Sequence, residues 1–125
     1  IDSRAADMLR LGQLQDALLR NARYIVGIRM HTQGMSVEDA VKFFVEEGYQ
    51  SKEVGEAETK RGTGDPTYLY YTLGKLQILK LRADMEKKLG RAFILQDFHD
   101  EFMRQGFPPI RIVRRTMLGD DSPTL

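Results

Sequence analysis

The apolar residues of this chain recur at steps of three and four, the spacing that places them on one face of an α-helix. No stretch of useful length alternates between apolar and polar residues as a half-buried strand does. The first apolar stripe lies within residues 7–30 and consists of Leu11, Leu14, Leu18, Ala22 and Ile25. The pattern therefore predicts an all-α protein that begins with an amphipathic helix of about six turns.

Capping residues and glycines divide the rest of the chain into further helices. Serines open two of them, and glycines or prolines bound the others. The expected ranges are about 36–47, 51–61, 66–89, 95–105 and 108–117. Residues 1–118 are thus expected to form one domain of about six helices packed as an irregular bundle, followed by a flexible tail over residues 119–125.

The helix expected over residues 66–89 is apolar on two nearly opposite sides. One stripe consists of Leu69, Leu73, Leu76 and Ala83, and the other of Tyr71, Gly74, Ile78 and Met85. A helix with two apolar faces belongs inside an assembly rather than at its surface. Because the chain also begins at Ile1 without a methionine, it is expected to be a fragment that lacks part of its natural core. Such a fragment would expose an apolar patch or bury it in a homo-oligomer.

The side of the first helix opposite its leucines carries Asp16, Arg20, Gly27 and His31. A glycine within a helix costs about 1 kcal/mol relative to alanine. Another helix or a ligand is therefore expected to approach Gly27 closely. The alternative is a solvated face on which Asp16 and Arg20 form an ion pair one helical turn apart.

Composition and charge exclude several classes of function. With 125 residues, a net charge of +1 and no cysteine, the chain offers no thiolate metal site, no disulfide and no global attraction to nucleic acid. Its apolar runs are too short to cross a membrane. The two histidines, His31 and His99, lie in no HExxH-type pattern, so we expect no complete zinc site within this sequence. Arg111, Arg114 and Arg115 are interpreted as surface arginines at the end of a helix.

The segment of residues 61–71 has the most specific local chemistry in the chain. Gly62 and Gly64 are expected to permit backbone angles that other residues resist. Asp65 is expected to be an N-cap, with Pro66 at the first helical position. Such a junction places an arginine and several phenols near a helix N-terminus, where they could grip a carboxylate or a developing oxyanion. An ordinary helix start is the alternative.

Four blocks of residues, taken in order, are similar to a known family. They are Arg20-x-x-Arg23 with residues 30–36; Arg61-Gly62-Thr63 with residues 65–69; residues 71–82, which include Gly74-Lys75-Leu76; and Phe98-His99-Asp100 with Gly106, Pro108 and Pro109. Together they resemble the C-terminal part of the bacterial family called domain of unknown function 885, over about residues 20–118.

The resemblance implies a helical, zinc-peptidase-like fold of which this chain is the C-terminal part. In that family an HExxxH-type metal motif and a further glutamate lie upstream of the region present here. No metal ligand or cofactor is therefore assigned to this chain, and zinc belongs to the upstream, metal-bearing part of the parent protein. Members often carry export signals, which favours a periplasmic or exported protein.

The same resemblance implies roles for three residues. His31 and Tyr71 would be catalytic and would stabilise the oxyanion formed from a scissile carbonyl. Arg61 would bind a carboxylate of a peptide substrate. Tyr68 is interpreted separately, as a residue of the packing or of the rim, and is taken with Arg61 as a candidate for substrate binding.

The expected function is that of the C-terminal helical part of a metal-dependent, peptidase-like hydrolase. This part would supply residues of the cleft wall and would be inactive alone. The alternative is a helical interaction or oligomerisation module without a catalytic parent. The two-faced helix over residues 66–89 is compatible with both.

Overall fold

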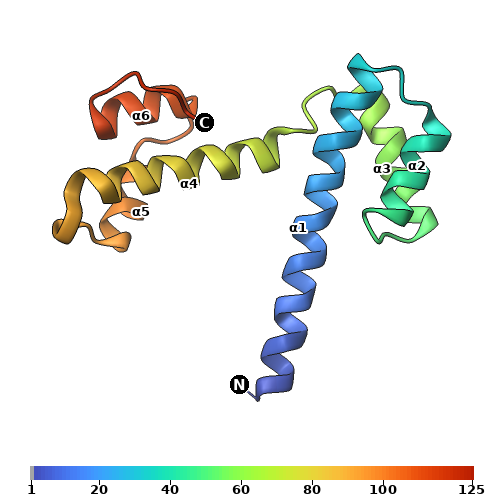
Figure 1. The fold of residues 1–125 in the computed structure, drawn as a ribbon, viewed down its shortest axis with the longest axis horizontal. Helices are drawn as coiled ribbons and strands as arrows, with labels where there is room; N and C mark the ends of the chain where they lie inside the picture. The colour runs from blue at the N-terminus through green and yellow to red at the C-terminus, as the bar shows by residue number, and fades with distance from the viewer. Residues whose placement is uncertain (1) are drawn as a thin grey trace. The chain divides into compact units, whose positions relative to one another are not determined.

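The computed structural model describes residues 2–125, and in that range it contains helices but no strand (Figure 1). The elements are α1 (Ser3–Thr32), α2 (Val37–Glu46), α3 (Lys52–Gly64), α4 (Tyr70–Leu89), the 3₁₀ turn η1 (Gly90–Ala92), α5 (Leu95–Arg104) and α6 (Ile110–Leu118). The predicted all-α fold with six α-helices is confirmed for the described residues. The helices fall into two compact units, Ile1–Thr72 and Leu73–Leu125. That residues 1–118 act as a single domain stays a prediction.

Helices α1, α2 and α3 build the first unit, and Figure 1 shows α2 and α3 beside the C-terminal half of α1. The core of this unit consists of Ala22, Val26, Ala40, Phe44 and Tyr68. Phe44 and Val26 are fully buried, and burial of an apolar side chain of this size contributes roughly 1.5–3 kcal/mol. Apolar packing of α1 against α2 therefore stabilises this unit, alongside the more extensive packing of α2 against α3.

The buried face of α1 is not the leucine stripe that the sequence predicts for an amphipathic helix. Leu11 and Leu14 are each 50% exposed and Ile25 is 37% exposed, whereas Ala22 and Val26 are buried. The leucine stripe and the buried stripe lie about 90° apart on a helical wheel. Both stripes are apolar, so periodicity alone did not identify which one α2 would cover. Of the predicted stripe, Ala22 enters the core.

The predicted helix caps are mostly confirmed. The side chains of Ser36 and Ser51 accept hydrogen bonds from the backbone N–H groups of Asp39 and Val54, at 3.0 and 3.3 Å. Gly106, which follows α5, has a φ of 73°, a left-handed conformation that favours glycine. These local signals act within a few residues, which is why the sequence reveals them.

Helices α4, α5 and α6 supply the core of the second unit, which consists of Leu81, Phe98, Val113 and Leu118. The ring of Phe98 lies 6.3 Å from that of Phe93 and 6.1 Å from that of Phe102, in tilted arrangements that aromatic pairs favour. Leu76 and Leu79 of α4 are each 46% exposed. The exposed apolar surface that the two-faced pattern predicts is therefore present on α4, and its burial in a homo-oligomer stays a prediction.

Arg114 of α6 is buried, so its interpretation as a surface arginine is wrong. Its Nη2 lies 2.7 Å from Oδ2 of Asp84, and its Nε lies 3.2 Å from Oδ1 of Asp120 and 2.8 Å from Oγ of Ser122. Asp84 is far away in the sequence, so helical spacing around Arg114 carried no sign of this contact. The tail is bonded to Arg114 through Asp120 and Ser122, and its flexibility stays a prediction.

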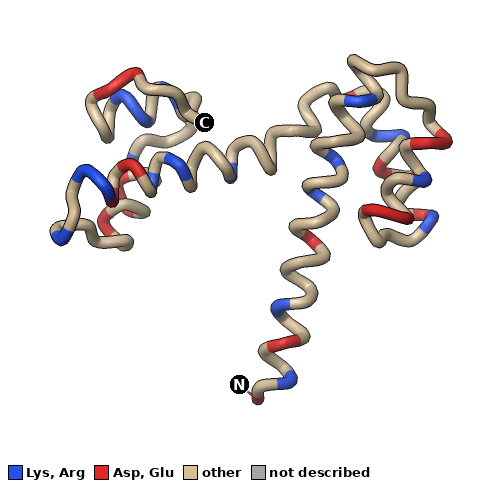
Figure 2. The backbone as a smooth tube through the Cα atoms, viewed as in Figure 1, with Lys and Arg blue, Asp and Glu red and all other residues tan. Residues whose placement is uncertain are grey.

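Charged residues of both signs are interspersed along the helices of both units (Figure 2). This distribution agrees with the net charge of +1. Within residues 2–125, none of the helices combines the length and the apolarity that a membrane crossing requires.

Candidate functional site

The junction between α3 and α4 carries the residues that sequence analysis singled out, but the helix start predicted there is wrong. Helix α4 begins at Tyr70 rather than at Pro66. The carboxylate of Asp65 instead accepts the backbone N–H of Thr67 at 2.8 Å, at the start of a turn. The turn directs Tyr68 into the core of the first unit, where its side chain is buried. Burial of this ring therefore overrides the local signal for a helix start.

Two glycines on different helices make room for Tyr68. A Cβ added to Gly27 of α1 would lie 2.9 Å from Cβ of Tyr68, and one added to Gly62 of α3 would lie 3.1 Å from its Cε2. The close approach predicted at Gly27 is thus confirmed, but the approaching group is a residue of the turn between α3 and α4 and not the helix or ligand that was expected. The prediction that Gly62 and Gly64 supply unusual backbone angles is wrong, because both lie within α3 and neither has a positive φ.

Arg23 of α1 and Glu58 of α3 form a two-point ion pair beside Tyr68. Nε of Arg23 donates to Oε2 of Glu58 at 2.6 Å, and Nη2 donates to Oε1 at 2.7 Å. The hydroxyl of Tyr68 lies 2.8 Å from the backbone carbonyl oxygen of Glu58 and 3.0 Å from its Oε2. The Tyr68 hydroxyl is thus engaged within the fold, which argues against its direct contact with a substrate.

The electrostatics of this cluster keep its three members in fixed protonation states. Burial raises the pKa of Glu58, but hydrogen bonds from Arg23 and Tyr68 and the charges of Arg23 and Arg61 outweigh it, so the net pKa lies below the usual value. Burial and the hydrogen bond to the Glu58 carboxylate raise the pKa of Tyr68. The hydrogen bond to Glu58 raises the pKa of Arg23. Around neutral pH the cluster therefore holds a guanidinium, a carboxylate and a neutral phenol.

Sequence reasoning missed Glu58 and treated Arg23 only as part of a family block. A usable signal was present in α3, where Gly55, Glu58, Thr59 and Gly62 recur at helical spacing and are all buried. Small residues and one acid on a single face of a polar helix indicate close packing around a buried charge. This pattern could have identified Glu58 but not its partner on another helix.

Tyr71, in the first turn of α4, is 59% exposed. The guanidinium carbons of Arg20 and Arg23 each lie 5.8 Å from the centre of its ring, within the range of cation–π attraction. The hydroxyl of Thr72 donates to Oδ1 of Asn21 at 3.0 Å and ties the start of α4 to α1. Among residues 2–125 the Tyr71 hydroxyl has no hydrogen-bond partner, so the ring is held while the hydroxyl stays available.

Arg61 and His31 both lie near the C-terminal end of α3. Arg61 belongs to the last turn of that helix, and His31 reaches it from α1. Nη1 of Arg61 lies 3.6 Å from Oε1 of Glu58, and the Arg61 side chain is 62% exposed. Nε2 of His31 lies 2.9 Å from the carbonyl oxygen of Gly62. Because a carbonyl oxygen only accepts, we assign the proton to Nε2, which leaves Nδ1 as the acceptor nitrogen of the neutral ring.

The structure thus places three of the four predicted residues around the Arg23–Glu58 pair. Tyr68 and Arg61 contact Glu58, and Tyr71 contacts Arg23. The fourth, His31, reaches this region through its bond to Gly62, the neighbour of Arg61. The exposed side chains here are guanidinium and phenol groups, which suit binding of a carboxylate or another oxygen anion.

These residues fit a metal ion less well than they fit a carboxylate or another oxygen anion. Among residues 2–125, no group of three histidine, aspartate or glutamate side chains is placed to hold a metal ion. The candidate residues include one histidine, and its Nε2 is already bonded to Gly62. These residues therefore do not fit a zinc centre, which normally takes three protein ligands at a catalytic site.

Comparison with known proteins identifies the family. A sequence model of the family described as "Bacterial protein of unknown function (DUF885)" matches residues 4–117. No curated protein and no solved structure matches the chain. The family match includes most of the 125 residues and both compact units. The chain therefore belongs to the bacterial family of unknown function DUF885.

Proposed function

We propose that the exposed surface around the Arg23–Glu58 pair is the substrate-binding wall of a peptidase-like hydrolase. The zinc of that hydrolase would be held by residues of the parent protein outside this sequence. One observation supports this proposal above the others. The ring of Tyr71 is held 5.8 Å from each of two guanidinium groups, while its hydroxyl has no partner among residues 2–125.

Each exposed residue has a role that its geometry permits. The Tyr71 hydroxyl can donate a hydrogen bond to the oxygen anion that forms when a peptide carbonyl is attacked. Arg61 can bind a carboxylate of the peptide through two N–H groups. His31 is less free, because Nε2 is bonded to Gly62 and Nδ1 can donate only when the ring is an imidazolium.

The buried part of the cluster supports this surface. Arg23 is held by Glu58 and in turn lies against the ring of Tyr71. A group that binds a transition state is most effective when its neighbours fix it before the substrate arrives. The ion pair would therefore position Tyr71, and Tyr68 would position the ion pair.

Carboxylate binding can be tested on the chain as it stands. We would titrate the ¹⁵N-labelled protein with N-acetyl-alanyl-alanine, which has a free carboxylate, and with the corresponding C-terminal amide. The acid should bind with a dissociation constant on the order of 1 mM and the amide at least about tenfold more weakly. Arg61→Gln should remove this preference, whereas Arg104→Gln, at an arginine with a 70% exposed side chain in the second unit, should not. Equal binding of acid and amide would contradict the assignment of Arg61.

The hydrolase role requires the full-length parent. Tyr71→Phe should lower its turnover by about 10²-fold or more, because one donor to the oxyanion is lost. Tyr70→Phe is the matched control, since Tyr70 is 63% exposed on the same turn of α4. Unchanged turnover in Tyr71→Phe, or a parent sequence without an HExxxH motif, would rule out the hydrolase role while leaving carboxylate binding intact.

A second function is favoured by the exposed leucine stripe of α1. Leu11 and Leu14 are half exposed on a helix segment whose other residues are also exposed. An isolated helical segment of this kind is marginal in water, so a partner helix would stabilise it. The chain would then be a non-catalytic oligomerisation module, and light scattering should show a homo-oligomer that Leu11→Glu dissociates. A monomer at millimolar concentration would contradict this alternative.

A further inference from the structure

Arg20 of α1 lies at the edge of the proposed binding surface. It precedes Arg23 by three residues, and its guanidinium carbon is 5.8 Å from the centre of the Tyr71 ring. Its Nη1 donates to the backbone carbonyl oxygen of Asp16 at 2.6 Å. The guanidinium is therefore held by a carbonyl and by an aromatic ring, although 41% of the Arg20 side chain is exposed.

One hydrogen-bonding edge of Arg20 is free. Its Nε and Nη2 have no hydrogen-bond partner among residues 2–125, whereas the same two atoms of Arg23 bind both carboxylate oxygens of Glu58. Two N–H groups on one edge of a guanidinium match the two oxygens of a carboxylate. Arg20 thus offers at the surface the edge that Arg23 uses inside the fold.

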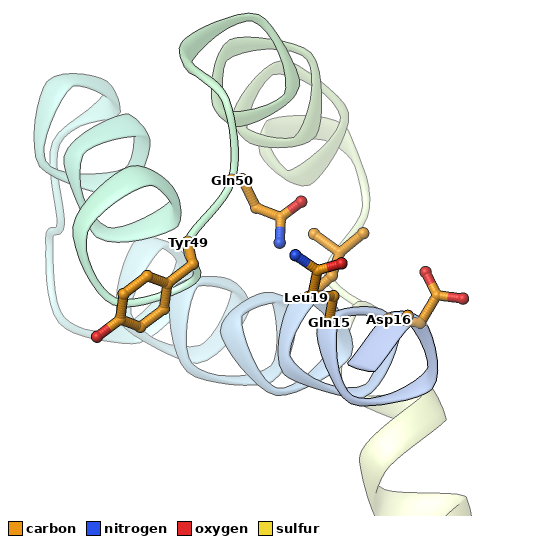
Figure 3. A pocket seen from close by; sticks show the side chains of 6 residues that line it. Gln15, Asp16, Leu19, Tyr49 and Gln50 are labelled. Atoms are coloured by element: carbon orange, nitrogen blue, oxygen red, sulfur yellow. The ribbon is translucent and has the colours of Figure 1, made fainter. Parts of the chain in front are cut away.

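The carboxylate of Asp16 does not occupy this edge. Its Oδ1 lies 3.7 Å from Nη1 of Arg20, the atom that is already bonded to the Asp16 carbonyl, and the Asp16 side chain is 74% exposed. Figure 3 shows the pocket beside Asp16, with the carboxylate directed away from the amide groups of Gln15 and Gln50. An ion pair this long and this exposed is weak. A carboxylate of a ligand can therefore bind to Nε and Nη2 of Arg20.

Helices α1 and α3 run beside each other in the same direction. Arg23 of α1 meets Glu58 of α3, and further along both helices His31 of α1 meets Gly62 of α3. Because the two contacts occur in the same order along both helices, a residue before Arg23 and a residue after Glu58 lie on opposite sides of the ion pair.

Arg20 and Arg61 are two such residues. Arg20 precedes Arg23 by three residues, and Arg61 follows Glu58 by three residues. Since a helix rises about 1.5 Å per residue, the two arginines are separated by roughly 9 Å along the helix axes. An extended peptide advances about 3.3–3.6 Å per residue. The separation therefore corresponds to roughly two to three residues of a bound peptide.

We propose that Arg20 binds an acidic side chain of the peptide substrate. The substrate class would be a short peptide with an acidic residue two positions before its C-terminal residue. This proposal rests on the proposed function, with the C-terminal carboxylate as the group that Arg61 binds. The peptide bonds between the two carboxylates would pass the exposed ring of Tyr71, which contacts both Arg20 and Arg23.

Other ligands suit the two arginines less well. Inorganic phosphate is smaller than a separation of roughly 9 Å, so one phosphate can occupy only one of them. A basic or purely apolar peptide offers no carboxylate besides its C-terminus, and it would leave the free edge of Arg20 without a partner. A peptide with two carboxylates engages both arginines.

The test compares four peptides by titration of the ¹⁵N-labelled chain. They are N-acetyl-glutamyl-alanyl-alanine, N-acetyl-glutaminyl-alanyl-alanine and the C-terminal amides of both. The glutamyl peptides should bind about threefold to fivefold more tightly than the glutaminyl peptides, as expected of one exposed ion pair. Inorganic phosphate is the small-anion probe, and phosphate binding as tight as that of the glutamyl acid would overturn the proposal.

Four variants separate Arg20 from its neighbours. Arg20→Gln should abolish the preference for the glutamyl peptides and leave the preference for the C-terminal acid over the amide, and Arg61→Gln should do the reverse. Arg10→Gln, at an exposed arginine earlier in α1, should change neither preference. Asp16→Asn should enlarge the glutamyl preference about twofold, because it removes a competing carboxylate 3.7 Å from Arg20. If Arg20 only supported Tyr71, this substitution would leave the preference unchanged.

The outcomes distinguish this inference from the proposed function. Equal binding of the glutamyl and glutaminyl peptides, with the preference for acid over amide intact, would overturn the role of Arg20 and leave that of Arg61. A glutamyl preference without a preference for acid over amide would contradict the role of Arg61 and leave that of Arg20. Absence of binding by all four peptides would overturn both. Binding of the glutaminyl acid to Arg20→Gln also shows that this variant is folded.

Discussion

Arg23 of α1 and Glu58 of α3 are joined by two hydrogen bonds of 2.6 and 2.7 Å, between side chains that are 12% and 9% exposed. This ion pair links two helices whose residues are 35 positions apart in the sequence. It also touches Tyr68 and Tyr71, and so connects the core of the first unit to its exposed surface. The pair is therefore both a structural bond and the support of the proposed binding surface.

Glu58→Gln should destabilise the protein by about 3 kcal/mol, because it leaves the guanidinium of Arg23 largely buried without a counter-charge. Urea unfolding followed by circular dichroism would measure the change. Glu56→Gln is the matched control on the same helix. Its side chain is 57% exposed and lies 3.8 Å from Lys52, so its removal should cost less than about 1 kcal/mol. Similar stability in the two variants would contradict the structural role of the Arg23–Glu58 pair.

The stability of the protein should decrease in acid partly through Glu58. The pKa of Glu58 is lower in the folded protein than its usual value, because the bonds and charges of Arg23, Tyr68 and Arg61 outweigh the effect of burial. Its contribution is therefore fully present above the unfolded pKa of about 4.3 and is lost as pH falls through the lower folded value. The difference in unfolding free energy between the unsubstituted chain and Glu58→Gln should shrink below about pH 4.3. A difference that is constant from pH 7 to pH 3 would contradict the assigned shift.

Gly27→Ala should be destabilising although alanine is the better helix former. Its Cβ would lie 2.9 Å from Cβ of Tyr68, and neither atom can move without a shift of the backbone, a strain of typically about 1–3 kcal/mol. Gly74→Ala is the matched control inside α4, because a Cβ there meets nothing within 4 Å. That variant should be neutral or more stable by up to about 1 kcal/mol. A melting temperature that falls in Gly27→Ala and is unchanged or higher in Gly74→Ala would support the contact. A higher melting temperature in Gly27→Ala would show that α1 and Tyr68 are not this close.

Arg114→Ala should destabilise the second unit much more than Arg115→Ala. Arg114 has a side chain that is 4% exposed and is bonded to Asp84 and Asp120, so its removal empties a buried site and breaks both bonds, although Asp84 keeps its bond to Lys80. We expect a loss of about 3 kcal/mol for Arg114→Ala. The Arg115 side chain is 55% exposed, and its removal should cost less than about 1 kcal/mol. Thermal unfolding of both variants would give the comparison, and equal losses would contradict the burial of Arg114.

The sequence predicted part of the candidate site and missed its centre. It singled out Arg61, Tyr71 and His31 through the family resemblance and Tyr68 as a packing or rim residue, and it predicted a close approach at Gly27. It did not identify Glu58, because a glutamate in a polar helix is usually exposed. Only the packing of α3 against α1 brings this residue to Arg23.

The helix start expected at Pro66 shows the same limit. Asp65 does accept the hydrogen bond that an N-cap would accept, from the backbone N–H of Thr67. The helix nevertheless begins at Tyr70, because Tyr68 turns inward between Gly27 and Gly62. A local preference of about 1 kcal/mol is smaller than the gain from burying an aromatic ring.

By itself the sequence determined the all-α fold, the approximate number of helices, two of the serine caps and the family. These properties follow from backbone preferences and from apolar spacing within one helix, which act over a few residues. The tertiary structure decided which stripe of α1 is buried, where α4 begins and which charges are paired. Those outcomes depend on contacts between segments far apart in the chain, as for Arg23 with Glu58 and Arg114 with Asp84, and apolar spacing carries no information about such partners.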